Sequence, residues 1–229
     1  MKKLKVMLYG AVALIASIAV TPLMAGSADF AGPYIAIQGN SLGTELDGSY
    51  TDGDGTITNG SGGKLLTIAG GEIGYSLPLS DTFFVSVGVT YYEGAAEISK
   101  HDDAADAADV KVEADEFWTA YIQPSISVSD NSAVFFKGGI SEADLNITGD
   151  YTGSASNELT GETVALGTKT IFGNGMYIQS EAGVTSYDQI SVNDIGTSET
   201  NDATDTDGLG DVKADPSIAY GAVTIGYKF

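Results

Sequence analysis

The chain ends in an alternating strand, Ala219-Tyr220-Gly221-Ala222-Val223-Thr224-Ile225-Gly226-Tyr227-Lys228-Phe229. One set of alternate positions is apolar or small and closes on two aromatic residues: Ala219, Gly221, Val223, Ile225, Tyr227 and Phe229. The positions between them are mostly small or polar. Because successive side chains of a strand point to opposite faces, one face suits lipid and the other a polar interior. The pattern predicts a membrane-spanning strand.

The N-terminus has the features of an export signal. A positive Met1-Lys2-Lys3-Leu4-Lys5 stretch precedes the apolar segment 6–23, and small residues lead up to Ala25. This order predicts a cleaved signal peptide at 1–25 and a mature domain at 26–229. A transmembrane anchor is the alternative, but no stop-transfer pattern follows. The mature segment contains no apolar run long enough for a membrane helix, so strands would have to span the membrane.

The composition excludes several classes of protein. There is no cysteine, and the 10 basic residues, all lysines, face 31 acidic ones, for a net charge of −21. Nucleic acid is excluded as a partner, because phosphate binding needs a basic surface. The chain has 30 glycines and 5 prolines. Together with period-2 segments, this indicates an all-β domain with many turns.

Further alternating segments precede the last one, and their connections differ in length. The segments are 32–43, 64–77, 82–92, 117–128, 133–140, 163–172 and 176–187. Short connections (78–81, 129–132, 173–175) alternate with long ones (44–63, 93–116, 141–162, 188–214). This layout predicts an eight-stranded antiparallel up-and-down transmembrane β-barrel, with short periplasmic turns and four long acidic extracellular loops. A soluble sandwich is the alternative, and it would bury the apolar faces against a second sheet.

Aromatic residues lie near both ends of these segments, as expected for two interfacial belts. One belt is predicted from Phe83, Phe136, Phe172, Tyr177, Tyr227 and Phe229, and the other from Tyr91, Tyr92, Trp118 and Tyr187. Pro124 falls inside a segment, where a bulge is expected, because proline cannot donate to the strand ladder.

The export signal, the Gly32-Pro33-Tyr34 opening, the long loops and the Gly226-Tyr227-Lys228-Phe229 ending resemble the small eight-stranded outer-membrane proteins of Gram-negative bacteria. That group includes opacity-type porin-like proteins and the barrel domain of outer-membrane protein A. The resemblance implies localisation in the cell outer membrane, with lipid and lipopolysaccharide as neighbours. It also implies that Tyr227 and Phe229 belong to a signal for the barrel-assembly machinery.

A few charged residues fall on the predicted lumen face. Glu72, Lys137, Lys169 and Glu181 stand at similar heights in the half with short turns. The interior of an eight-stranded barrel is just wide enough for side chains to fill. An isolated buried charge costs roughly several kcal/mol, so we expect these four charged side chains to pair and to block the lumen. A gate that opens when the pairs break is the alternative.

Most acidic residues lie in the four long connections. Solvated loops explain them, and loosely bound divalent cations are a further expectation. The segments 51–57 and 205–208 resemble parts of a calcium loop, but Tyr50 and Ser61, and likewise Ala203 and Ala214, stand where acidic ligands belong. We therefore predict no specific metal site and no cofactor.

Three functions are compatible with the sequence. The first is a structural or surface-interaction barrel with a plugged lumen, and the second is a narrow cation-preferring porin whose acidic mouth concentrates cations. The third is a lipid-modifying enzyme, whose chemistry usually needs a histidine base near a serine. The single histidine, His101, follows Ser99 in an acidic loop, and adjacency in a loop does not make a catalytic site. The sequence thus favours a protein that is not an enzyme.

Overall fold

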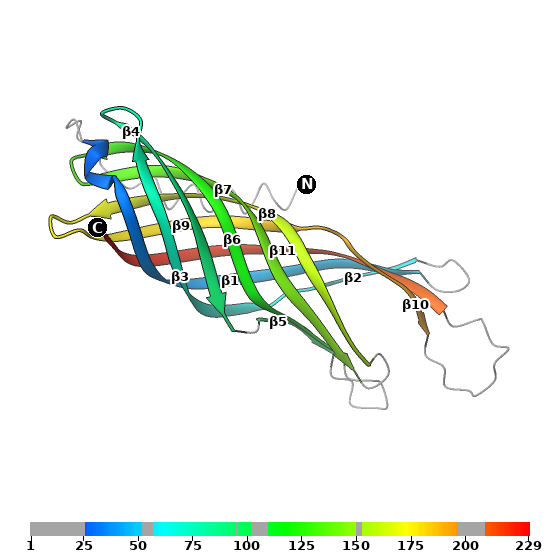
Figure 1. Ribbon diagram of the computed structural model, residues 1–229. Coiled ribbons are helices and arrows are strands. Elements are labelled where there is room, and N and C mark those ends of the chain that lie inside the picture. The colour runs from blue at the N-terminus through cyan, green and yellow to red at the C-terminus, as the bar shows by residue number, and fades with distance from the viewer. Residues whose placement is uncertain (1–25, 52–56, 95, 102–109, 150–152, 197–208) are drawn as a thin grey trace.

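The computed structural model describes residues 26–51, 57–94, 96–101, 110–149, 153–196 and 209–229. Eight antiparallel strands form a closed wall (Figure 1): β1 (Gly32–Thr51), β3 (Leu65–Pro78), β4 (Phe83–Glu93), β6 (Val110–Ser129), β7 (Ser132–Gly149), β8 (Gly153–Ile171), β9 (Met176–Tyr187) and β11 (Leu209–Lys228). Each pairs with the next, and β11 pairs with β1. This confirms the expected up-and-down barrel of eight strands.

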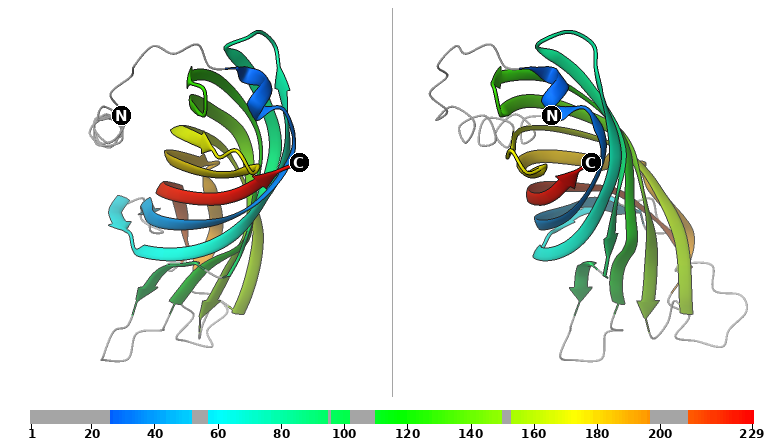
Figure 2. Two further views of the ribbon diagram at one scale, coloured as in Figure 1. Left: turned by 90° about the vertical axis from the view of Figure 1, so that its left-hand side faces the viewer. Right: turned by 60° about the vertical axis from the view of Figure 1, so that its left-hand side comes forward.

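The pairing of the first and last wall strands closes the barrel. Tyr34 lies opposite Lys228 at one end of this seam, and Thr51 lies opposite Asp211 at the other. Figure 2 shows β1 and β11 side by side in both views. The C-terminus and the short turns lie at the same end of the barrel (Figure 1).

The wall strands extend further than the sequence indicated. β1 continues to Thr51 and β7 to Gly149, while β6 begins at Val110 and β8 at Gly153. Three shorter strands continue the hairpins: β2 (Ile57–Gly62), β5 (Ala96–His101) and β10 (Ile190–Gly196). Much of the four expected loops is therefore paired strand. Backbone hydrogen bonds continue there, and inward residues such as Ala143, Leu145 and Leu159 are still apolar and buried. The outward positions have become polar or acidic, as at Asp144 and Glu158, so the alternation is the reverse of the one that delimited the expected strands.

The bulge expected at Pro124 is absent, and a bulge occurs elsewhere on β6. Ile122 lies opposite Gly138 and Ser125 opposite Phe135, so the register does not change across the proline. The pairing with β7 shifts register between Asp115 and Trp118, where Glu116 has a φ of 50°, and again between Ser127 and Ser129 beside the turn. A proline removes one backbone hydrogen-bond donor from the strand pairing but adds no extra residue. A residue with a left-handed backbone conformation, such as Glu116, can be the extra residue of a bulge.

Inward aromatic rings lie over inward glycines of the neighbouring strand. In each case the two residues are direct cross-strand partners, and a Cβ on the glycine would overlap the ring or the base of the aromatic side chain. The pairs are Tyr34–Gly74, Tyr92–Gly70, Tyr121–Gly88, Tyr121–Gly139, Phe135–Gly167, Tyr187–Gly161, Tyr220–Gly183 and Tyr177–Gly226. The missing Cβ makes room for a ring in a lumen with little spare width.

The N-terminal part of the described chain lies at the short-turn end. It forms a single 3-10 turn, η1 (Ser27–Phe30), whose Phe30 ring stacks on Phe84 with centroids 4.7 Å apart. The backbone N–H of Ser27 donates to Asp81 O at 2.7 Å, and Lys228 Nζ donates to Asp29 O at 3.0 Å. These contacts hold η1 against the wall, between the β3–β4 turn and the end of β11.

We predict that Gly226→Ala destabilises the barrel by about 1–3 kcal/mol, the usual cost of overpacking. The new methyl group would overlap the Tyr177 ring. Gly221→Ala is the matched control on the same strand, because nothing lies within 4 Å of its added Cβ. Urea unfolding of the refolded barrel in lipid vesicles measures both changes. Equal destabilisation by the two variants would contradict the packing argument.

Candidate functional site in the lumen

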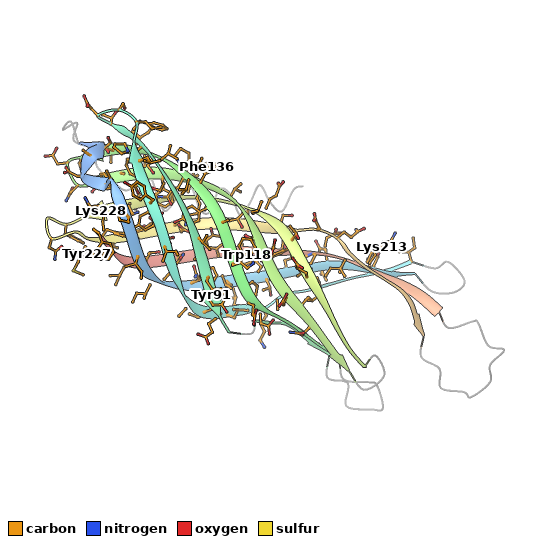
Figure 3. The ribbon with its side chains drawn as sticks, viewed as in Figure 1. Tyr91, Trp118, Phe136, Lys213, Tyr227 and Lys228 are labelled. Atoms are coloured by element: carbon orange, nitrogen blue, oxygen red, sulfur yellow. The ribbon has the colours of Figure 1, made fainter. Side chains whose placement is uncertain are left out.

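The barrel has its polar residues inside and its apolar residues outside. Large apolar side chains are exposed on the wall; examples are Ile37 (70% exposed), Ile73 (60%) and Val223 (57%). Figure 3 shows Tyr91, Trp118, Phe136 and Tyr227 along this outer surface. The lumen instead buries a polar set: Gln38, Asn40, Glu72, Thr90, Gln123, Lys137, Lys169, Gln179, Glu181 and Thr224. This inversion is what a barrel needs when its outer face meets lipid.

Three aromatic residues assigned to the interfacial belts face the lumen instead. Tyr177 and Tyr187 are buried, at 1% and 8% exposure, and Tyr92 packs against the buried apolar cluster of the lumen. Each occupies an inward position of its strand. Their places near strand ends suggested the belts, but the two-residue period decides which face a side chain takes. Phe83, Phe136, Phe172, Tyr227, Phe229, Tyr91 and Trp118 have outward positions.

The four charged residues considered for the lumen all lie inside it. Lys137 Nζ is 2.6 Å from Glu181 Oε2 and 3.5 Å from Glu72 Oε2. Glu181 also accepts hydrogen bonds from Gln179 Nε2 at 3.0 Å and Tyr220 OH at 3.2 Å. One ammonium thus bridges carboxylates from β3 and β9, across the interior. Such a bridge compensates charges that water no longer solvates.

Lys169 lies apart from this bridge. Within the described residues, it forms no ion pair within 4.0 Å; its Nζ instead lies 4.5 Å from the Tyr34 ring centroid and 4.2 Å from that of Tyr177. Aromatic faces attract cations, most strongly where water is excluded. The structure therefore brings three of the four residues together and places the fourth between two tyrosines.

The lumen is filled in layers along its axis. At the short-turn end, an aromatic-rich cluster comprises Phe30, Tyr34, Ala36, Phe84, Ala133, Ile171 and Tyr177. The charged bridge follows. Toward the long hairpins lies a second apolar cluster: Leu42, Ala114, Phe117, Ala143, Leu145, Leu159, Tyr187 and Ile218. In the part of the barrel that the structure describes, buried side chains from several strands meet in each of these layers.

The sequence did not reveal two parts of this interior. Tyr34 OH and Tyr121 OH hydrogen-bond across the lumen at 2.8 Å. Thr119, Ser141, Thr163 and Thr185 form a chain of hydroxyl groups with successive O–O distances of 2.7, 2.6 and 2.6 Å. The signal for the first was present: inward tyrosines recur opposite inward glycines. The second depends on strand register, which composition does not give.

Some expectations fall on residues outside the described part of the chain. These include the signal peptide at 1–25 and most of the two calcium-like segments. His101 is the last residue of β5, and its side chain is likewise outside. Among the described residues, no group of three or more His, Cys, Asp or Glu could hold a metal ion. None of the helical structure described there is long and apolar enough to cross a membrane.

No protein-family profile and no curated protein matches the sequence. Among solved structures, the outer membrane protein OprG from Pseudomonas aeruginosa aligns at 15% identity, covering 87% of this chain and 97% of its own, with a TM-score of 0.48. Ail, the attachment invasion locus protein of Yersinia pestis, aligns at 12% identity over 85% and 99%, with a TM-score of 0.42. The outer membrane protease OmpT from Escherichia coli aligns at 11% identity over 86% and 97%, with a TM-score of 0.44. At identities and TM-scores this low, the similarity concerns the fold and does not extend to function.

We predict that Lys137→Met destabilises the barrel by about 3–5 kcal/mol, the usual cost of leaving a buried charge without its partner. Here Glu72 and Glu181 would both lose their cation. Adding Glu72→Gln and Glu181→Gln to this variant removes the stranded charges and should restore most of the stability. Denaturant unfolding of the three proteins measures the effect. A single variant as stable as the wild type would show that the bridge contributes nothing.

Proposed function

We propose that this protein is an outer-membrane β-barrel with a structural or surface-interaction role, and that its lumen is plugged. The observation that carries the proposal is the combination of an apolar outer wall with an interior occupied by successive layers of buried side chains. An exposed apolar surface of this extent needs lipid around it. A filled interior supports a scaffold rather than a passage for solutes. The proposal assigns no catalytic role.

The outward residues support one orientation in the membrane. Next to the apolar band, toward the long hairpins, outward or exposed positions carry acidic side chains: Glu45, Glu93, Glu116, Glu142, Glu162, Asp188 and Asp215. Lys213 lies further along the extended hairpin (Figure 3). We place this edge at the outer surface, beside lipopolysaccharide, and the short turns in the periplasm. Divalent cations held loosely between carboxylates and lipid phosphates would relieve the repulsion there.

The last strand supports the proposed assembly signal. Tyr227 and Phe229 face outward, at 43% and 69% exposure, and their rings meet edge to face with centroids 5.1 Å apart. Both are therefore accessible on the wall at the short-turn end. We propose that the barrel-assembly machinery recognises this pair.

A narrow cation-preferring porin is the second candidate. One observation favours the porin. Lys137 lies 3.5 Å from Glu72 but 2.6 Å from Glu181, so the contact with Glu72 is the weaker one and the more easily broken. Movement of Lys137 would open space beside Glu72, and the acidic hairpins would concentrate cations at the mouth.

Single-channel recording separates the two candidates. We expect that the heat-modifiable, refolded protein gives silent planar bilayers, because side chains occupy every layer of the lumen. The control variant is Lys137→Ala with Glu72→Ala and Glu181→Ala, which empties the charged layer and should raise the frequency of conducting events. Regular, cation-selective steps from the wild-type protein would exclude the plugged scaffold and establish the porin.

A further inference from the structure

At the short-turn mouth of the lumen lies a segment that does not belong to the wall. β1 begins at Gly32, which lies opposite Ser76 of β3, and the pairing of β1 with β11 starts at Tyr34 and Lys228. η1 precedes this point and takes part in none of the described strand pairings; Figure 1 shows it in blue beside the β3–β4 turn. Moving η1 would therefore break no hydrogen bond of the strand ladder.

Phe30 is the side chain of η1 that enters the lumen. It is 3% exposed, and its ring stacks on that of Phe84, an inward residue of β4, with 9° between the ring planes. It belongs to the aromatic-rich cluster, whose other members come from β1, β4, β7, β8 and β9. One residue outside the wall thus packs among side chains from much of its circumference.

Phe30 also forms part of the lining of a small cavity inside the mouth. The volume of this cavity is about 10 Å³, and its other lining residues are Tyr34, Lys169, Ile171, Tyr177 and Lys228. Lys169 and Ile171 are buried. Phe30 therefore shields Lys169, which forms no ion pair within the described residues, from the solvent at the short-turn end.

The polar contacts between η1 and the wall are few in the part of the chain that the structure describes. The backbone N–H and the hydroxyl of Ser27 donate to Asp81 O and Ser80 O in the β3–β4 turn. On the other side, Lys228 Nζ donates to Asp29 O. Such hydrogen bonds contribute little net stability, because water replaces them when they break. The burial of the Phe30 ring is therefore the main contact that holds η1 in place.

We propose that η1 is a lid on the short-turn mouth of the lumen, and that it opens by rotation of the backbone at Gly32. Gly32 has a φ of 120°, in a region open to glycine, so the chain can turn there without strain. Opening withdraws Phe30 and exposes Lys169 and the aromatic-rich cluster to the short-turn side. The charged bridge stays closed, because wall strands alone supply its residues. The lid requires no conduction through the barrel, so it stands apart from the choice between scaffold and porin.

The test measures how fast a buried thiol reacts with N-ethylmaleimide in the full barrel, refolded in detergent micelles. The chain has no cysteine, so a single introduced one is the only thiol. Ile171→Cys places it in the cavity behind the lid, and Asp130→Cys places it in the exposed β6–β7 turn. We expect Ile171→Cys to react at least about tenfold more slowly, because the lid must open first. Equal rates would mean that the mouth is open throughout and would overturn the proposal.

Two variants loosen the lid in different ways. Phe30→Ala should raise the labelling rate of Ile171→Cys at least about tenfold, because opening no longer exposes a buried ring. Lys228→Met removes one hydrogen bond but leaves the ring in place, and should raise the rate about three- to tenfold. Phe136→Ala is the matched control, since its ring faces outward (Figure 3) and the rate should not change. Heat-modifiable migration establishes that each variant is folded.

A thiol beyond the charged bridge separates lid opening from a general loosening of the barrel. Leu145→Cys lies in the apolar cluster toward the long hairpins, and its labelling should stay slow in every variant. Equal acceleration of Leu145→Cys and Ile171→Cys by Phe30→Ala would show that the ring stabilises the whole barrel, and would refute the lid. An unchanged rate at Ile171→Cys in Lys228→Met would show that Phe30 is a fixed plug, which also contradicts the proposal.

Discussion

The width of the lumen is the constraint on which the rest of this structure depends. Eight strands enclose a space only just large enough for their own inward side chains, so each large residue needs a small one opposite. The rings of Tyr34, Tyr121 and Tyr177 meet this requirement by lying over glycines of neighbouring strands. The interior is thus built from matched cross-strand pairs rather than from a core between two layers.

The same narrowness decides how charge is accommodated. Lys137 on β7 meets the carboxylate of Glu72 on β3 and that of Glu181 on β9, because long side chains from these strands can reach one another within the narrow interior. Lys169, placed nearer the aromatic cluster, is surrounded by tyrosine rings instead. Two lysines of similar burial are therefore stabilised by different means, ion pairing in one case and ring faces in the other.

The two-residue period was sufficient to predict the fold and the faces. It placed Glu72, Lys137, Lys169 and Glu181 on inward positions, where the structure has them. It failed beyond the apolar band, because the outward positions there are polar or acidic while inward residues such as Leu145 and Leu159 stay apolar, which reverses the pattern that marked the strands. The contacts between individual side chains of the lumen could not be predicted, since a contact such as that of Lys169 with Tyr34 depends on the register of strands that are distant in sequence. The aromatic residues opposite glycines contained part of that information.

The aromatic-over-glycine pairs are distributed unevenly around the wall. Each pair of wall strands joined by a hairpin has at least one, whereas among the described pairings the seam between β1 and β11 has none. The seam joins residues such as Tyr34 and Lys228, which lie almost the whole chain apart. Bringing them together carries the largest loss of chain entropy of any pairing in the barrel, and no ring-on-glycine contact offsets it. Closing the ring therefore costs more chain entropy than forming any one hairpin, and the long continuous register from Tyr34–Lys228 to Thr51–Asp211 has to offset that cost.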